Sequence, residues 1–349
     1  MILSLSTRDP GEFKQKYVSD SINPQAVILW NYQEWNYKNF GNNDINNLFT
    51  WNHLIKYINE KDCQLYVVNG DFDHSPVLYD QRNPLFSRIK VIHYPYYFLY
   101  IWHDRFYLKA GQQNQNIDYK YTFVSLNSKP HWYRCLQVDK LAKYQLMDKA
   151  AVSWNSFDWT ENRRNIDASN EYDWKHWQPK IQLLDNIRDI HAGWTNQIPD
   201  QYHQSFAHLV TEATPYSFFI TEKTVPALRL LKPFIISSRA GIHKLLTDLG
   251  FLLYDEVFDY AFDKVEDIDK RFDMIAENLQ KLSLYSQSDL KNLYQKIYPK
   301  LVHNQSHYAN MIKDINKIDS FLIDLCENQK DIVKNQTFYD HYWHCKESM

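Results

Sequence analysis

The sequence has few cysteines, no long hydrophobic run and no recognisable secretion signal. The cysteines are scattered without a CxxC pair or another metal-ligand spacing, so we expect reduced, structural thiols. They are Cys63, Cys135, Cys326 and Cys345. No run approaches the ~20 apolar residues of a membrane-spanning helix. The apolar start at residues 1–7 is too short for a signal peptide, since Arg8 and Asp9 follow it. These absences predict a soluble, cytoplasmic protein.

Concentrated basic charge is also absent. The net charge is −3, the isoelectric point is near 6.5, and no block of Lys or Arg occurs. The sequence therefore disfavours nucleic acid as a partner. Aromatic residues, in contrast, make up 16% of the chain. Many lie in polar contexts such as Trp30-Asn31-Tyr32, which suits stacking on a sugar or a base. An aromatic-rich core in a chain with few glycines would give the same composition.

Strand-like runs and helical stretches alternate along residues 205–254. The strands are expected at 205–210, 217–220, 233–237 and 251–254, and the helices at 225–232 and 243–249. Such alternation predicts a parallel sheet with crossover helices, whose ligands bind beyond the carboxyl ends of the strands. Thr221-Glu222-Lys223-Thr224 lies at such an end, with Thr224 as an expected N-cap and Pro226 in the first helical turn. Free N–H groups and the helix dipole there favour an anion.

The remaining sequence predicts two α/β domains, as does the length of 349 residues. Strands of the first unit are expected at 2–5, 26–30, 64–68 and 88–94, with a helix near 48–59. The polar stretch 109–119 is the expected linker. Elements of the second unit are expected at 121–126, 130–147 and 151–154, followed by a long excursion over 155–178, and residues 268–345 are mostly helical in pattern. We therefore predict domains at 1–115 and 116–320 and a helical tail at 321–349.

Charged side chains follow the predicted strands of the second domain. Lys223 is placed to neutralise a diphosphate and to stabilise its departure, and Glu222 to accept hydrogen bonds from a ribose diol. Arg134, in the first turns of the helix after strand 121–126, can fork onto phosphate oxygens. Glu212 is expected on the same rim of the sheet. A solvated lysine, a carboxylate that complements the helix dipole and an exposed helix arginine are the plainer interpretations.

Asp71-Phe72-Asp73 follows the strand at 65–68 and has the Asp-x-Asp spacing of a metal-binding pair. Such pairs arise by chance in a chain rich in Asp, as Asp267-Ile268-Asp269 shows. His93, His103 and Asp104 have no ligand spacing either. We therefore expect no metal site.

Four stretches of the chain resemble motifs of the alpha-1,3-fucosyltransferase family. The family has a Phe-x-x-E-N-type strand end followed by a Y-V-T-E-K loop, a helix and an apolar strand. The corresponding residues here are Leu209-Val210-Thr211-Glu212 and Phe219-Ile220-Thr221-Glu222-Lys223. Upstream, Phe123-Val124-Ser125-Leu126-Asn127 with Arg134 is similar to the strand-S-N-loop-arginine element. Residues 88–97, RIKVIHYPYY, resemble the R-x-P-x-Y-Y entry.

The resemblance implies a GT-B fold, in which two Rossmann-like α/β domains face each other across a cleft. It implies metal-independent, inverting transfer of a sugar from a nucleotide diphosphate to a glycan acceptor, with GDP-fucose as the donor and no cofactor. Arg134 and Lys223 would hold the diphosphate, Glu222 the ribose, and Glu212 the donor sugar or its surroundings. Thr221 and Asn127 belong to the same matched elements.

Two departures from the family pattern concern the chemistry. Ala213 replaces the asparagine after the first glutamate, and the general base of the first domain has no clear counterpart between residues 80 and 88. An inverting transfer needs a base near the acceptor hydroxyl. Of the nearest carboxylates, Asp71, Asp73 and Asp80, we assign this role to Asp73. The membrane anchor of the animal enzymes has no counterpart, which fits a microbial or viral relative.

Three other functions stay open at this point. The same fold could act on modified bases in DNA, although the absence of a basic surface disfavours it. A metal-dependent transferase would use Asp71 and Asp73. A glycan-binding protein with a decayed site would bind sugar without turnover through aromatics such as Trp30, Trp35 and Trp102.

Overall fold

The computed structural model divides the chain into two compact units, and each is described by itself. Unit 1 comprises Met1–Asp104 and Met311–Met349, and unit 2 comprises Arg105–Asn310. The domain limits expected from the sequence, 1–115, 116–320 and 321–349, stay a prediction. The described residues are 2–6, 26–31, 57–69, 88–93, 98, 117–127, 131–154, 198–212, 215, 218–327 and 332–333.

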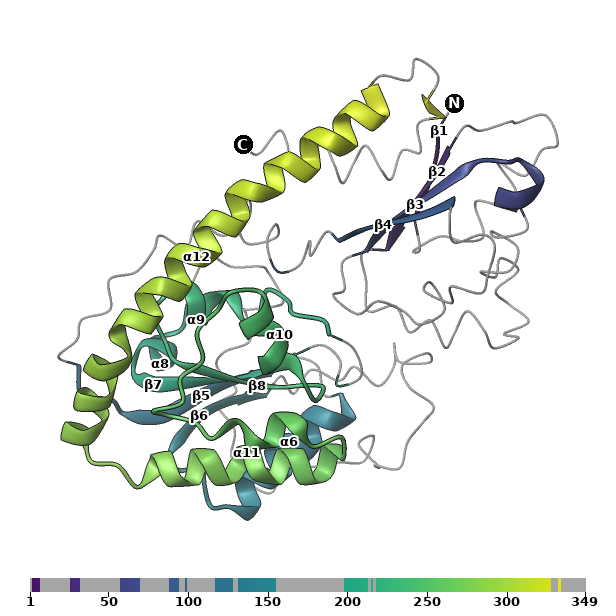
Figure 1. Cartoon of the computed structure of the whole chain (residues 1–349). Helices are drawn as coiled ribbons and strands as arrows, with labels where there is room; N and C mark the ends of the chain where they lie inside the picture. Colours follow the sequence, from purple (N-terminus) through teal and green to yellow (C-terminus); the bar gives the residue numbers. More distant parts are fainter. Residues whose placement is uncertain are drawn as a thin grey trace. The chain divides into compact units, whose positions relative to one another are not determined.

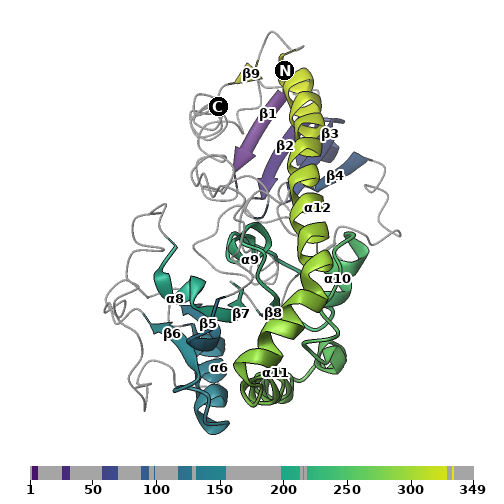
Figure 2. The same ribbon diagram turned by 90° about the vertical axis from the view of Figure 1, so that its left-hand side faces the viewer.

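Unit 1 contains a parallel sheet with the strand order β4-β3-β2-β1-β9 (Figure 2). The strands are β1 (Ile2–Ser6), β2 (Ala26–Asn31), β3 (Gln64–Asn69), β4 (Ile89–His93) and β9 (Ile332–Val333). The first four confirm the strands predicted from the sequence. Of the helix expected near 48–59, residues 57–60 are described and helical.

Strand β9 corrects the expectation of a helical chain through residue 345. It pairs in parallel with β1, Ile2 with Ile332 and Leu3 with Val333. Because its two residues are β-branched, they suit a pleated strand better than a helix. A run of two residues is too short to produce a readable alternation, so the sequence pattern gave no sign of it.

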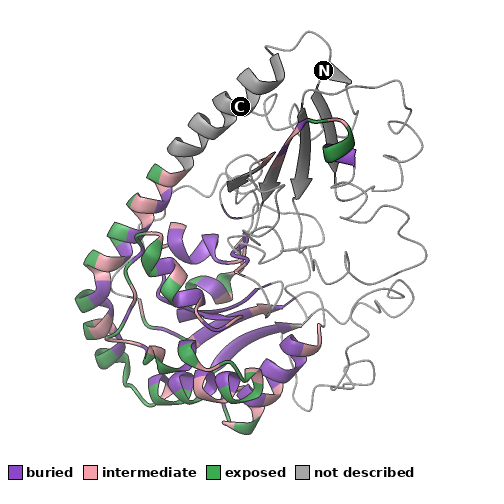
Figure 3. Cartoon of the chain, turned by 45° about the vertical axis from the view of Figure 1, so that its right-hand side comes forward, coloured by how far each residue is buried: buried purple, intermediate pink, exposed green. Residues whose placement is uncertain are grey.

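Unit 2 is built on a second parallel sheet, with the strand order β6-β5-β7-β8. The strands are β5 (Tyr121–Asn127), β6 (Ala150–Trp154), β7 (Ser205–Thr211) and β8 (Phe234–Ser237). Every residue of β7 and of the edge strand β8 is buried, as expected for parallel strands that are covered on both faces (Figure 3). The mixed α/β class predicted from the sequence is confirmed.

Helices cover both faces of this second sheet (Figure 1). On one face lie α6 (Trp132–Lys143) and α11 (Ile268–Ser283), and on the other α9 (Val225–Arg229) and α10 (Ile242–Asp248). Lys140 joins α6 to α11, since its Nζ lies 2.8 Å from a carboxylate oxygen of both Asp269 and Asp273. The other helices are α8 (Asp200–His203), the 3-10 helix η2 (Tyr260–Lys264) and α12 (Gln287–Glu327).

Two of the predicted strands are wrong. Residues 218–220 and 251–254 are irregular. Phe219 and Ile220 are nevertheless buried, so the apolar run at 218–220 reflects a loop that packs into the core. In the second segment, Asn304 of α12 takes the place of a neighbouring strand. Its side chain accepts from the N–H of Leu252 and donates to the carbonyl of the same residue, both at 2.8 Å. A short apolar run cannot by itself distinguish these cases from a strand.

Helix α9 ends at Arg229, three residues before the limit expected from the sequence. Leu231 has a φ of 53°, which is the left-handed conformation that commonly terminates a helix. Lys232 N–H donates to the carbonyl of Ala227 at 2.9 Å, and the Tyr294 hydroxyl donates to the carbonyl of Leu231 at 3.0 Å. The helix therefore has only five residues.

Candidate functional site

The strand order of unit 2 places a change of crossover direction between β5 and β7. The chain leaves β5 towards β6 on one side, and it leaves β7 towards β8 on the other. Open α/β sheets bind their ligands beyond the carboxyl ends of the strands at such a switch point. The residues that end β5, β7 and β8 are Asn127, Thr211 and Ser237. Thr211 pairs with Ser237, and Val124 pairs with His208, three residues before Asn127 and Thr211. These three side chains therefore share one edge.

Glu212 follows β7 directly and is completely buried. Its Oε1 accepts from the N–H of Thr221 at 3.0 Å and from the hydroxyl of Thr224 at 2.8 Å. Its Oε2 accepts from the hydroxyl of Thr221 at 2.5 Å. Burial raises the pKa of Glu212, while the charge of Lys223 and the hydrogen bonds from Thr221 act in the opposite direction. The carboxylate thus joins the end of β7 to the loop at 221–224.

Lys223 lies within this loop, and its side chain is 15% exposed. Its Nζ lies 3.0 Å from the hydroxyl oxygen of Thr221 and 2.9 Å from Oε1 of Glu222. The side chain of Glu222 is 9% exposed. Lys223 and Glu222, which the sequence predicts to bind a donor nucleotide, therefore form an ion pair with each other.

Thr224 occupies the N-cap position of α9, as expected, but makes no capping hydrogen bond. Its hydroxyl donates to Glu212 instead. Because α9 has only five residues, its dipole is a small contribution, and an anion at this helix start stays a prediction. The positive charge of the region comes from side chains.

Arg134 is the third residue of α6 and is 3% exposed, which excludes the interpretation as an exposed helix arginine. Its Nη2 donates a long hydrogen bond, at 3.4 Å, to the backbone carbonyl oxygen of Glu212. Arg134, Glu212, Thr221, Lys223 and Glu222 therefore form a continuous set of contacts. The structure brings together the predicted residues of three separate sequence segments.

Polar groups surround Asn127 at the same edge. Its N–H donates to Ser153 Oγ at 3.0 Å, and its Nδ2 donates to Ser125 Oγ at 3.1 Å. Gln137 Oε1 accepts from Ser237 Oγ at 2.7 Å. Three buried atoms here, Asn127 Oδ1, Thr211 Oγ1 and Gln137 Nε2, have no hydrogen-bond partner among the described residues. Buried polar atoms usually have one. This edge thus holds more hydrogen-bonding capacity than the described residues use.

Gln137, Thr211 and Ser237 were not singled out from the sequence. Gln137 follows Arg134 by three residues on α6, so the two lie on one face of the helix. This spacing was a usable signal. Thr211 and Ser237 end their strands, which becomes informative only when the strand order is known.

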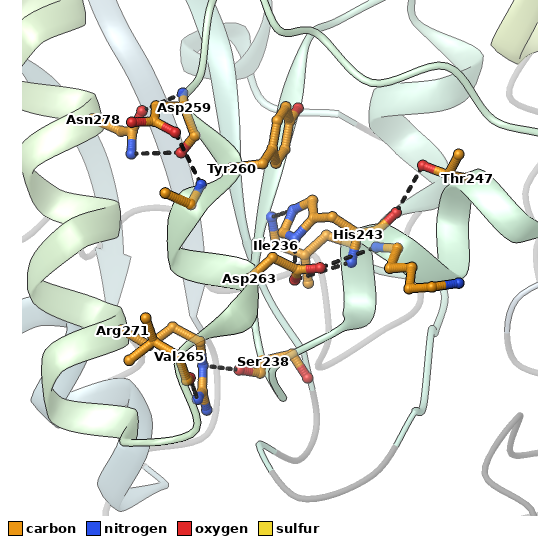
Figure 4. Close-up of polar contacts among 12 residues, drawn as sticks. Ile236, Ser238, His243, Thr247, Asp259, Tyr260, Asp263, Val265, Arg271 and Asn278 are labelled. Atoms are coloured by element: carbon orange, nitrogen blue, oxygen red, sulfur yellow. Dashed lines mark hydrogen bonds and ion pairs between the residues drawn. The ribbon is translucent and has the colours of Figure 1, made fainter.

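A second group of contacts fixes the chain beyond β8 (Figure 4). The N–H of Ile236 donates to Nε2 of His243 at 3.0 Å, and Nδ1 of that ring lies 2.9 Å from Asp263 Oδ1. Arg271 Nε donates to the carbonyl of Ser238 at 2.9 Å, and its Nη1 donates to that of Glu266 at 2.9 Å. These side chains come from α10, η2 and α11. They hold the carboxyl end of β8 in place.

The predicted general base lies outside the described residues. This holds for Asp73 and also for Asp71, Asp80, His103, Asp104, Trp35 and Trp102. Within the described part of the chain, no group of three or more His, Cys, Asp or Glu side chains could hold a metal ion. None of the described helices has the length and apolar character needed to cross a bilayer.

The chain has a structural neighbour among solved proteins but no match among protein families. No protein-family model matches the chain, and no curated protein matches it. The crystal structure of an alpha1,3-fucosyltransferase aligns over 88% of this chain and 92% of its own, with a TM-score of 0.36 and 11% sequence identity. A score this low does not establish a shared fold. The proposals that follow rest on the residues of unit 2.

Proposed function

We propose that the protein is a GT-B glycosyltransferase that transfers a sugar from a nucleotide diphosphate to an acceptor hydroxyl with inversion. The observation that carries this proposal is the set of contacts joining Arg134, Glu212, Thr221, Lys223 and Glu222 at the switch point of the unit 2 sheet. Two cations and a carboxylate at this position suit a diphosphate and a ribose. The resemblance to fucosyltransferase motifs favours GDP-fucose as the donor and a glycan as the acceptor.

The transfer needs a base that takes the proton of the acceptor hydroxyl and cations that neutralise the leaving diphosphate. The acceptor oxygen attacks the anomeric carbon, and its proton passes to the general base. The bond between that carbon and the diphosphate oxygen breaks, and the nucleoside diphosphate leaves with the bonding electrons. Lys223 and Arg134 neutralise the charge that develops on this leaving group, which is the role that preorganised cations play in phosphate chemistry. The transfer needs no metal in this scheme.

The ion pair between Lys223 and Glu222 suggests how the donor is admitted. With Nζ 2.9 Å from Oε1, each group satisfies part of the other's charge before the donor binds. A diphosphate then replaces Glu222 as the partner of Lys223, and the freed carboxylate accepts hydrogen bonds from the ribose diol. Because both side chains are largely buried, this exchange keeps either charge from being left without a partner.

Ligand binding tests the proposal directly. We expect GDP and GDP-fucose to raise the melting temperature more than UDP, CDP or their sugars at equal concentration. A ligand that binds only the native state at 100 times its Kd adds about 2.7 kcal/mol to the free energy of unfolding. A thermal-shift series followed by an assay of donor consumption measures both parts. If millimolar concentrations of all three nucleotides leave the melting temperature unchanged, the proposal fails.

We propose Asp73 as the general base. The acidic base of the family has no clear counterpart in this sequence, and Asp73 is one of the nearest carboxylates and follows a predicted strand of the first domain. We expect Asp73→Asn to lower kcat by about 100-fold, since general base catalysis contributes about 100- to 10,000-fold. The affinity for GDP should stay the same, as measured by titration calorimetry. Asp80→Asn is the matched control and should keep its turnover. Unchanged turnover in Asp73→Asn would remove the residue from this role.

A further inference from the structure

We infer that Glu212 and Thr221 are positioning residues that hold the ammonium of Lys223 where the leaving diphosphate binds. The inference rests on the proposed function for its catalytic part. The motif resemblance implies that Glu212 contacts the donor sugar. We assign it a different role, in which it acts on the donor only through Thr221 and Lys223. The contacts around the Thr221 hydroxyl carry the argument.

The Thr221 hydroxyl has one proton and two lone pairs. Glu212 has only acceptor oxygens as a carboxylate, so the short contact of 2.5 Å requires Thr221 to donate its proton to Oε2. The lone pairs of the same oxygen then face the donors of Lys223, with Nζ at 3.0 Å and the backbone N at 3.4 Å. The carboxylate therefore sets the direction of the hydroxyl, and the hydroxyl sets the position of the ammonium.

The carboxylate of Glu212 is itself fixed by burial and by hydrogen bonds to both of its oxygens. It is 0% exposed, and its oxygens accept from the N–H of Thr221 and from the hydroxyls of Thr221 and Thr224. Because Glu212 is completely buried, a sugar hydroxyl would reach it only if the surrounding chain moved. Because all of these partners belong to the loop at 221–224, the carboxylate of Glu212 fixes the position of that loop.

The two threonines allow the catalytic arrangement to be separated from plain stabilisation of the loop. Both Thr221 and Thr224 are buried, and both donate a hydroxyl proton to Glu212. Of these two threonines, only Thr221 also contacts Lys223 in the part of the chain that the structure describes. Thr224→Val is therefore the matched control for Thr221→Val, because each variant removes one hydroxyl from the same carboxylate with nearly unchanged side-chain volume.

The kinetic test compares Thr221→Val, Thr221→Ser and Thr224→Val. We expect Thr221→Val to lower kcat by about 10-fold or more with an unchanged KM for the acceptor, since displacement of a catalytic group by about 1 Å can cost 100-fold. Thr221→Ser keeps the hydroxyl and should recover kcat to within about 3-fold of the wild type, and Thr224→Val should stay in the same range. Equal losses of kcat in the two valine variants would show a structural role and overturn the inference.

A labelling measurement tests the arrangement without any turnover. Acetylation of Lys223 by a lysine-reactive anhydride, followed by mass spectrometry, reports how firmly its amine is held. We expect Lys223 to react about 3-fold faster in Thr221→Val than in the wild type, because a hydrogen bond to Nζ is lost. Its rate in Thr224→Val and the rate of the exposed Lys244 should not change. If the labelling prediction holds in a protein that binds no nucleotide, only the proposed function fails. If Lys223 reacts equally fast in all variants, the inference fails whatever the donor.

Discussion

Lys223→Ala is expected to lower kcat for sugar transfer by about 100-fold or more. The amine of Lys223 is held at the carboxyl edge of the unit 2 sheet by Thr221 and Glu222. In the proposed reaction it neutralises charge that is larger in the transition state than in the bound donor. Loss of such a group lowers kcat, whereas loss of uniform binding would raise KM alone. Removal of one preorganised donor typically costs about 100- to 1,000-fold.

Steady-state kinetics with GDP-fucose and a set of glycan acceptors would measure this effect. Lys244→Ala is the control, because Lys244 is exposed and paired with Asp248 one turn along α10. Lys223→Ala also removes the lysine that pairs with Glu222. The melting temperature of this variant should therefore be recorded, and the rates should be measured well below it. A Lys223→Ala enzyme that folds and retains the wild-type kcat would contradict the proposed mechanism.

Lys232→Met is expected to make the protein more stable near neutral pH. Lys232 is 1% exposed, and burial lowers its pKa to about 7. Its Nζ donates to the carbonyl of Ser205 and lies 5.2 Å from the centre of the Tyr202 ring. No carboxylate partner is described for it. Removing a buried amine that titrates in this way should stabilise unit 2 by about 2 kcal/mol at pH 7, after the loss of these contacts.

The dependence on pH gives the prediction its sign. In the unfolded chain the pKa of a lysine is near 10.5, so the unfolded state binds about half a proton more than the folded state at pH 7 and nearly one proton more at pH 8 to 9. The free energy of unfolding therefore rises with pH over this range, by about 2 kcal/mol from pH 7 to pH 9. His208 stays neutral there, because burial lowers its pKa to about 3.

Denaturant unfolding of wild type and Lys232→Met at pH 7, 8 and 9 would measure the difference. The advantage of the variant should shrink as the pH rises, and Lys244→Met should show no such trend. A constant difference between wild type and Lys232→Met would mean that the amine keeps its charge in the fold. Ser205 begins β7 and Lys232 precedes β8, so both lie at the strand ends opposite to the candidate site. Donor binding should therefore be unaffected.

The strands that form the candidate site were predictable because each is an apolar run ended by polar residues. β5, β7 and β8 were found in this way, and their ends carry Asn127, Thr211 and Ser237. The adjacency of Thr221, Glu222 and Lys223 is given by the chain itself. The sequence alone could not show that Glu212 binds the loop at 221–224, because that contact depends on how the chain returns after β7.

The errors share a physical cause. The run at 218–220 is apolar because it packs into the core as a loop, and the backbone of Leu252 is satisfied by a side chain of α12. Thr224 is the N-cap residue of α9, as predicted, but its hydroxyl donates to a buried carboxylate in place of a capping bond. In each case a contact from a distant part of the chain determines the local structure, and local patterns carry no record of it.

The pairing of β1 with β9 has a consequence for the order of events during synthesis. Unit 2 is a continuous segment, whereas the sheet of unit 1 combines residues from both ends of the chain. At about 5–20 residues per second, the ribosome needs tens of seconds to proceed from β4 to β9. During that interval the outer edge of β1 lacks its neighbour in the sheet and is open to pairing with other chains. Unit 2 can therefore complete its fold on the ribosome while unit 1 still awaits its last strand.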